Sequence, residues 1–211
     1  METTRTQPRR RKPTEVRRTE IADAALRVMA MQGGRRFTAR ALADEVGVTD
    51  GALFRHFPSM DAIVDAVVER MESMLLLAAP PANADPIERL GVFFRARVAV
   101  LVAHPHLTRL LFSDDLVRLC GAARAKRMKG FKRRTRTFIE SCLVEAEAKG
   151  LLGDRLDPQE GALLVQGAVF AFGHTSGGRA GVQRMSNHVW SALESLLRGT
   201  GREPRSRRKA T

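Results

Sequence analysis

The chain has 211 residues, of which 44% are hydrophobic and 28% charged, so it can bury a sizeable core in one compact unit or two small ones. No apolar run approaches the roughly 20 residues of a membrane span, and the charged N-terminus is unlike a signal peptide. Cys120 and Cys142 lack the spacing of a disulfide or zinc site, so we expect a cytoplasmic protein with no membrane partner.

The net charge of +13 is concentrated in three stretches. Residues 1–20 hold seven basic and three acidic side chains, residues 122–136 eight basic and no acidic ones, and residues 198–211 six basic and one acidic. The rest of the chain is slightly acidic, so the basic excess is local. A local excess indicates contact with a polyanion at particular surfaces.

The chain begins with a basic segment, residues 1–13, that has no apolar periodicity. Such a segment cannot bury enough surface to order itself, so we expect a disordered arm. In free solution the arm is a solvated tail. With DNA present, Arg9, Arg10 and Arg11 would follow phosphates or enter a minor groove. Residues 199–211 predict a similar tail.

A first helix is expected from about residue 14 to 31, and two short helices follow it. Thr38 is a good N-cap for a helix over Ala39–Val46, and Gly47 suits the left-handed residue that ends it. Thr49 then caps a second helix over Asp50–Phe57. Two short helices joined by a glycine turn are typical of a helix-turn-helix, whose second helix enters a DNA major groove.

The run Val-Gly-Val-Thr-Asp-Gly-Ala-Leu-Phe-Arg-His-Phe-Pro-Ser, residues 46–59, resembles the turn, recognition helix and exit of the TetR family of bacterial repressors. The likeness extends over about residues 17–71. It implies that the DNA contacts of that family fall here on Thr38, Thr49, Asp50, Gly51, Ala52, Phe54, Arg55 and His56.

Residue chemistry gives several of these positions a role. Gly51 and Ala52 leave room for the groove floor, and Arg55 suits either a guanine edge or a phosphate. Phe54 stands where the family usually has a tyrosine, and Met60 where a lysine is common, so two phosphate contacts are missing. Asp50 is either a carboxylate favoured by the helix N-terminus or an acceptor from a cytosine amino group.

The remaining chain predicts helices only, and so an all-α fold. Apolar periodicity, Asp-Pro starts and glycine stops place them at about residues 59–79, 85–103, 107–112, 115–149, 158–174 and 184–198. We expect a helix-turn-helix DNA-binding domain at residues 14–58. A helical regulatory and dimerisation domain would follow at residues 59–198.

The resemblance implies a homodimer whose last two helices pack against their copies, bound to double-stranded DNA at a palindromic operator. The interface residues would be Val165, Val169, Phe172, Val189, Trp190, Leu193 and Leu197. A small-molecule inducer would enter the helical domain, near Phe94, Arg97, Leu101, Phe112, Phe138 and Phe170. Aromatic residues at helical spacing are also typical of an ordinary core.

No glycine-rich phosphate loop, nucleophile elbow, zinc pair or histidine-centred triad spacing occurs. We therefore expect a nucleoid-associated regulator rather than an enzyme, with no cofactor and no metal. His104 and His106 flank Pro105 without a further ligand at a supporting spacing, which favours a helix corner over a metal site.

Two alternatives to a ligand-responsive repressor stay open. The run Ala103–Leu111 resembles the corner of the nucleoid-occlusion branch of the family, which implies a DNA-dependent regulator of cell division with a protein partner. The basic tails alone would suit a non-specific nucleic-acid binder. The stretch 124–136 suits a solvated face, an acidic partner, a second DNA contact or anionic lipid.

Overall fold

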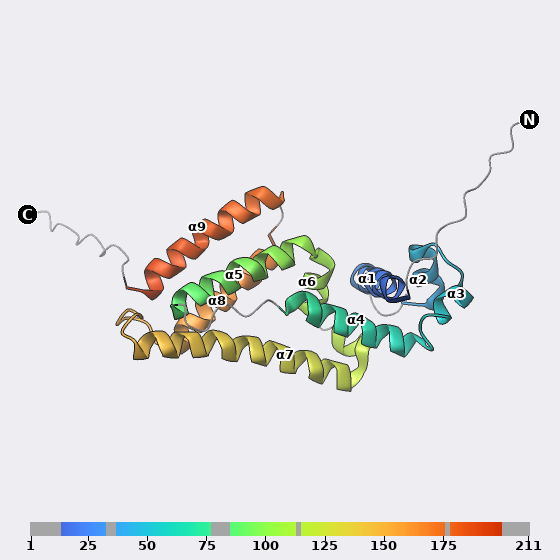
Figure 1. The fold of residues 1–211 in the computed structure, drawn as a ribbon, viewed down its shortest axis with the longest axis horizontal. Coiled ribbons are helices and arrows are strands. Elements are labelled where there is room, and N and C mark those ends of the chain that lie inside the picture. Colours follow the sequence, from blue (N-terminus) through green and yellow to red (C-terminus); the bar gives the residue numbers. More distant parts are fainter. Residues whose placement is uncertain (1–13, 33–36, 77–84, 113–114, 176–177, 200–211) are drawn as a thin grey trace, which may run out of the picture. The chain divides into compact units, whose positions relative to one another are not determined.

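The computed structural model describes residues 14–32, 37–76, 85–112, 115–175 and 178–199. Their regular structure is entirely helical, as the sequence predicts, and Figure 1 shows the arrangement within each part. The helices are α1 (Thr14–Gln32), α2 (Ala39–Val46), α3 (Asp50–Phe54), α4 (Met60–Leu75), α5 (Pro86–Ala103), α6 (Pro105–Leu111), α7 (Asp115–Ala148), α8 (Pro158–Gly173) and α9 (Arg179–Leu197).

No single helix in these ranges has the length and apolarity to cross a membrane. Only α5 and α6 taken together, across a bend of 104°, have both.

The chain packs into two compact units. The first takes residues up to 73 together with 110–125, and the second takes residues 74–109 together with those from 126 onward. This division differs from the predicted boundary at residue 58, because most of α4 packs with the N-terminal helices. Arg70 of α4, for example, donates from Nε and Nη2 to the Asp23 carboxylate of α1 at 2.8 and 3.3 Å. Helix α7 contributes to both units.

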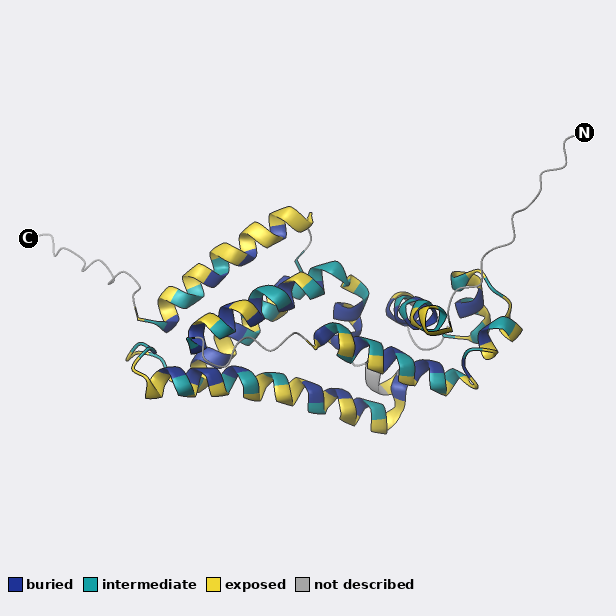
Figure 2. Cartoon of the chain, viewed as in Figure 1, coloured by how far each residue is buried: buried dark blue, intermediate teal, exposed yellow. Residues whose placement is uncertain are grey.

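The first unit buries one face of each helix from α1 to α4 (Figure 2). Leu42 is the buried anchor of α2 and Leu53 that of α3, and Phe57 follows directly after α3. The largest fully buried side chains of this unit are Ile21, Met29, Leu42, Leu53, Phe57, Ile63 and Met71. Burial of such side chains is the main stabilising contribution to a small helical domain.

Helix α7 has a break and a buried stripe that decide how its basic stretch lies. Gly121 interrupts the helix with φ 75° and ψ 169°, a conformation that other residues avoid. After the break, the buried positions are Ala125, Met128, Phe131, Ile139, Cys142, Leu143 and Ala146. The basic side chains are exposed, but they stand on an ordered helix.

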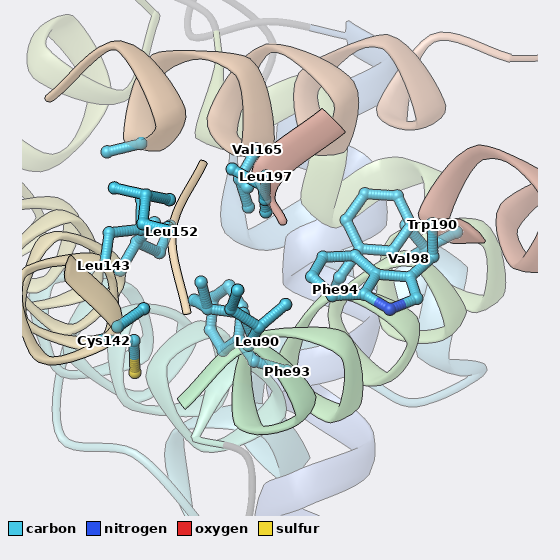
Figure 3. Close-up of a cluster of buried hydrophobic side chains, with 14 of the residues drawn as sticks. Leu90, Phe93, Phe94, Val98, Cys142, Leu143, Leu152, Val165, Trp190 and Leu197 are labelled. Carbon is cyan, nitrogen blue, oxygen red and sulfur yellow. The ribbon is translucent and has the colours of Figure 1, made fainter. Parts of the chain in front are cut away.

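The second unit is organised around α5, against which α8 and α9 pack (Figure 1). Gly91 lets Trp190 of α9 lie on the α5 backbone, because a Cβ at Gly91 would stand 2.6 Å from the indole Nε1. The Phe94 ring packs against Trp190, with centroids 5.5 Å apart, and against Phe172 of α8, 5.9 Å apart. Figure 3 shows Phe94 and Trp190 together in this cluster.

The ends of α8 and α9 follow local chemistry. Asp157 Oδ1 accepts hydrogen bonds from the backbone N–H groups of Gln159 and Glu160, at 2.7 and 2.8 Å, so the predicted Asp-Pro start of α8 is confirmed. Helix α9 begins at Arg179, earlier than expected. Gly178 is extended there (φ −67°, ψ 143°), and the following Arg and Ala are good helix formers.

Candidate nucleic-acid interface

The turn between α2 and α3 is held by its capping residues. Thr38 Oγ1 accepts from the Ala41 N–H at the start of α2, and Thr49 Oγ1 accepts from the Ala52 N–H at the start of α3, both at 3.2 Å. Gly47 between them is left-handed (φ 70°, ψ 46°), and its N–H donates to carbonyl groups in the last turn of α2. Each threonine hydroxyl keeps its own proton, which a phosphate oxygen can accept.

Helix α3 turns most of its candidate DNA-contacting residues outward. Leu53 is fully buried and anchors the helix, while Ala52 and His56 are half-buried. The exposed candidates are Thr38, Thr49, Asp50, Gly51, Phe54 and Arg55. The other candidates, Arg9, Arg10 and Arg11, lie outside the described residues.

The predicted end of α3 at Phe57 is wrong, because the regular helix ends at Phe54. A tighter turn follows, in which the His56 N–H donates to the Leu53 carbonyl at 3.0 Å. Pro58 accounts for this, since the residue before a proline is pushed out of the helical region. The shortening leaves Arg55 at the helix end, where it is exposed.

Gly51 has no structural reason to be glycine. A Cβ built there meets no heavy atom within 4 Å, and Gly51 is not among the residues with positive φ. A glycine in a helix costs up to about 1 kcal/mol relative to alanine. An exposed glycine without a steric need is consistent with close approach of a partner at this position.

Arg18 of α1 holds the end of α3 and is a residue that the sequence analysis missed. Its Nη1 donates to the His56 carbonyl at 2.8 Å, and its guanidinium carbon lies 4.4 Å above the Phe57 ring. The contact joins residues 38 positions apart, so no local pattern reveals it. It ties α1 to the two residues that follow Arg55.

The His56 side chain is half-buried. Its Nδ1 is buried and has no hydrogen-bond partner among the described residues. A contact of this ring with nucleic acid would therefore run through Nε2. For that contact to donate, the proton must sit on Nε2.

Arg124 links α7 to α4 within the first unit. Its Nη1 and Nη2 donate at 3.0 Å to Asp61 Oδ1 and Asp65 Oδ2, and Nη2 also reaches the Asp61 carbonyl at 3.0 Å. Hydrogen bonding to Asp65, followed by that to Asp61, raises the Arg124 pKa above its usual value. The first residue of the basic stretch is therefore a structural link and not a solvated charge.

The predicted ligand residues do not form one pocket. Phe94 and Leu101 are packed in the core, Phe170 is 49% exposed on α8, and Phe112 belongs to the other compact unit. Arg97 and Phe138 do lie together in the second unit, on either side of Phe93. A cavity of about 350 Å³ opens elsewhere, between α5 and the start of α9. Its lining is Val98, Ala99, Val102, Ala103, Arg179, Ala180, Val182 and Gln183.

Four of the predicted interface side chains are inside the subunit. Val165, Phe172, Trp190 and Leu197 are at most 5% exposed, so they cannot face a second copy, and this part of the prediction is wrong. Val169, Val189 and Leu193 are half-buried. The apolar side chains that α8 and α9 do expose are Leu163, Leu164, Phe170, Met185 and Leu196.

Comparison with known proteins gives a family match over the helix-turn-helix. Residues 21–67 match the family model described as "Bacterial regulatory proteins, tetR family". A nucleoid occlusion factor SlmA from Marinobacter nauticus is 30% identical over 76% of this chain and 85% of its own length. The HTH-type transcriptional repressor KstR2 of Mycobacterium tuberculosis is 26% identical over 67% of this chain and 72% of its own length.

Two solved structures share the fold. The ketosteroid transcriptional regulator KstR2 of Mycobacterium tuberculosis has a TM-score of 0.71 at 21% identity, covering 86% of this chain and 95% of that one. AibR, in complex with isovaleryl coenzyme A and operator DNA, has a TM-score of 0.64 at 20% identity, covering 86% and 98%.

Proposed function

The chain belongs to the TetR family of bacterial regulatory proteins, and we propose that it is a homodimeric repressor that α3 directs to a palindromic operator. The proposal rests on the capped helix-turn-helix. Thr38, Gly47 and Thr49 hold the turn, and Arg18 holds the segment that follows α3. The exposed residues between Thr49 and Arg55 then form a rigid surface that fits a major groove.

The operator symmetry comes from the proposed dimer. The side chains that α8 and α9 expose include Leu163, 72% exposed, and Leu196, 49% exposed. An exposed apolar face of this kind is typical of a protein–protein interface, and two copies joined through it are related by a two-fold axis. Two α3 helices would then read half-sites about one turn of DNA apart (~34 Å).

We further propose that a small molecule binding in the second unit releases the DNA. AibR was solved with isovaleryl coenzyme A and operator DNA together, and KstR2 is named a ketosteroid regulator. Both names join DNA regulation to a molecule with an apolar body. A ligand that favours a spacing of the two α3 helices that does not fit the operator shifts the population away from the DNA-bound state.

Selection of bound duplexes from a random pool tests the proposed sequence recognition by α3. We expect a two-fold symmetric consensus for the wild-type chain. Arg55→Ala should relax the preference at one base pair of each half-site, because a bidentate guanine contact is worth about 1–3 kcal/mol. Arg40→Ala, an exposed arginine on α2, is the matched control. Recovery of no consensus, or of one without symmetry, would contradict the proposal.

A nucleoid-occlusion role is the second candidate, and the SlmA relative from Marinobacter nauticus, which spans most of both chains, favours it. Mapping of the bound sites over the genome separates the two. One or two promoter sites support a local repressor, whereas dozens of sites scattered over the chromosome support nucleoid occlusion.

A further inference from the structure

Aromatic side chains of α5 and α7 meet around one arginine in the second unit. The Phe93 ring of α5 lies 5.3 Å from the Phe138 ring of α7, and the Arg97 guanidinium carbon lies 5.1 Å from Phe93 and 5.6 Å from Phe131. We call Phe93, Arg97, Phe131 and Phe138 the α5–α7 layer. It is aromatic except for one cation, and that cation lies within the core.

Arg97 is only 6% exposed, and its Nε is buried without a hydrogen-bond partner. Among the described residues, no carboxylate and no carbonyl oxygen accepts from its guanidinium. The electron-rich ring faces of Phe93 and Phe131 lie against the guanidinium and replace part of its lost hydration.

Two other arginines of the same unit have carboxylate partners, although the Nε of Arg89 is also buried without a hydrogen bond. Arg89 is paired with Glu145, and Arg198 donates to Asp85 at 3.1 Å and to Glu194 at 3.0 Å. Burial lowers the Arg97 pKa to about 10, so the side chain still carries its charge near neutral pH. A buried cation without an anion is costly to the folded state, and proteins retain one where something else compensates it.

We propose that Arg97 receives the anionic head of a small amphipathic ligand whose apolar body lies along the rings of the α5–α7 layer. A guanidinium presents two parallel N–H donors, which match the two oxygens of a carboxylate. Arg134 lies over the same Phe131 ring, 5.6 Å from its centroid, and adds positive charge at this place. A neutral ligand would leave the buried charge uncompensated.

The cavity between α5 and α9 is a poorer site for this ligand. Its polar side chains, Arg179 and Gln183, are exposed, so an anion bound there stays in competition with water. An ion pair at an exposed position contributes little. Arg97 offers the same guanidinium where water is excluded, and this difference favours the α5–α7 layer.

The inference rests on the inducer part of the proposed function, and it is tested without DNA. The full chain is titrated by calorimetry, and its melting temperature is followed, with straight-chain carboxylates of six to sixteen carbons. Each carboxylate is paired with the alcohol of the same length and with its coenzyme A thioester. We expect binding and a raised melting temperature with the carboxylates or the thioesters and not with the alcohols. The thioester series separates a free acid from an acyl-coenzyme A.

Arg97→Met keeps an unbranched, flexible stem and removes the charged guanidinium. We expect it to lose affinity for the anion at least about tenfold, because a charged hydrogen bond is lost. Without ligand its melting temperature should equal or exceed that of the wild type, because the uncompensated cation is gone. Arg97→Lys should bind with intermediate affinity. Arg95→Met, on the same helix but less buried, should bind like the wild type.

Two results would overturn the inference. One is a wild-type chain that no anion of the panel stabilises more than its alcohol. The other is an Arg97→Met chain that melts well below the wild type while its remaining affinity is unchanged, which indicates a structural cation–π contact. Operator selection is independent of both results, so failure at Arg97 leaves the DNA-binding proposal standing, and failure of that selection leaves the anion site standing.

Discussion

The two compact units place polar and apolar side chains in opposite ways. In the first unit Leu42, Leu53 and Phe57 are fully buried, and the charged and hydroxyl groups of α3 point outward. In the second unit the cation Arg97 is 6% exposed, whereas Leu163 is 72% exposed. The first arrangement is the ordinary one for a small soluble domain.

Each departure of the second unit from that arrangement corresponds to a proposed partner. A buried cation is compensated by an anion, and an exposed apolar face by another apolar face. In the first unit, by contrast, the half-buried arginines include Arg18, Arg70 and Arg124, and each of these three has an acceptor. Its exposed polar groups are instead available to DNA. This difference between the units supports the proposals that place the ligand and dimer contacts in the second unit and the operator contact in the first.

The largest expected effect separates two phenylalanines of the second unit. Phe94→Ala should lower the free energy of unfolding by about 3–5 kcal/mol, because it leaves a cavity beside Trp190 and Phe172. Phe170→Ala, on the exposed side of α8, should change it by less than about 1 kcal/mol. Urea denaturation at one protein concentration measures both. Equal losses would mean that Phe170 is also part of the core.

The exposed apolar face gives the next effect. Leu163→Glu combined with Phe170→Glu should convert the dimer to monomers, because carboxylates would be buried without partners. A monomer has one α3 helix instead of two, so operator binding should weaken by about 100-fold or more. Light scattering and a DNA-binding titration measure these changes. Val144→Glu, at an exposed valine of α7, is the control, and a dimer that survives the double change would contradict the proposed interface.

A smaller effect is expected at the link between α4 and α7. Arg124→Ala removes the hydrogen bonds to Asp61 and Asp65, but both carboxylates are largely exposed, so the loss should be about 1 kcal/mol. The difference should shrink at high salt, because screening weakens the pair in the wild-type chain. Thermal unfolding at low and high salt measures it, with Lys129→Ala as the control. A loss that salt does not change would assign the effect to packing.

The sequence predicted what short-range signals decide. The caps at Thr38, Thr49 and Asp157 and the left-handed Gly47 act within a few residues, so the helix starts and the turn could be recognised. The interface prediction included four residues that are buried in the subunit, because α8 is apolar on several sides. Periodicity alone could not decide that Val165 faces inward and Leu163 outward.

Long side chains explain the rest of what the sequence did not reveal. The Arg18–His56, Arg70–Asp23 and Arg124–Asp65 contacts join residues 38, 47 and 59 positions apart. These contacts join helices α1, α4 and α7 and the residues after α3, so the first unit extends beyond the predicted domain of residues 14–58. Arg97 was included among the ligand residues by resemblance, but only the structure reveals that it is buried without an acceptor.

Gly51→Ala should have the smallest effect on stability. It should stabilise the protein while it weakens binding to the operator. Gly51→Ala adds a Cβ into open space and removes a helical glycine, so we expect a gain of up to about 1 kcal/mol in the free energy of unfolding.

The same methyl group stands on the exposed face of α3, where it should hinder approach to the groove and weaken operator binding. Urea denaturation and a DNA-binding titration on one preparation measure the two effects. Gly130→Ala, at a helical glycine of α7 where a Cβ would meet only the end of the Arg134 side chain at 3.8 Å, should gain stability without weakening the DNA contact. If Gly51→Ala gains stability and binds the operator as tightly as the wild type, the groove does not approach α3 at this residue.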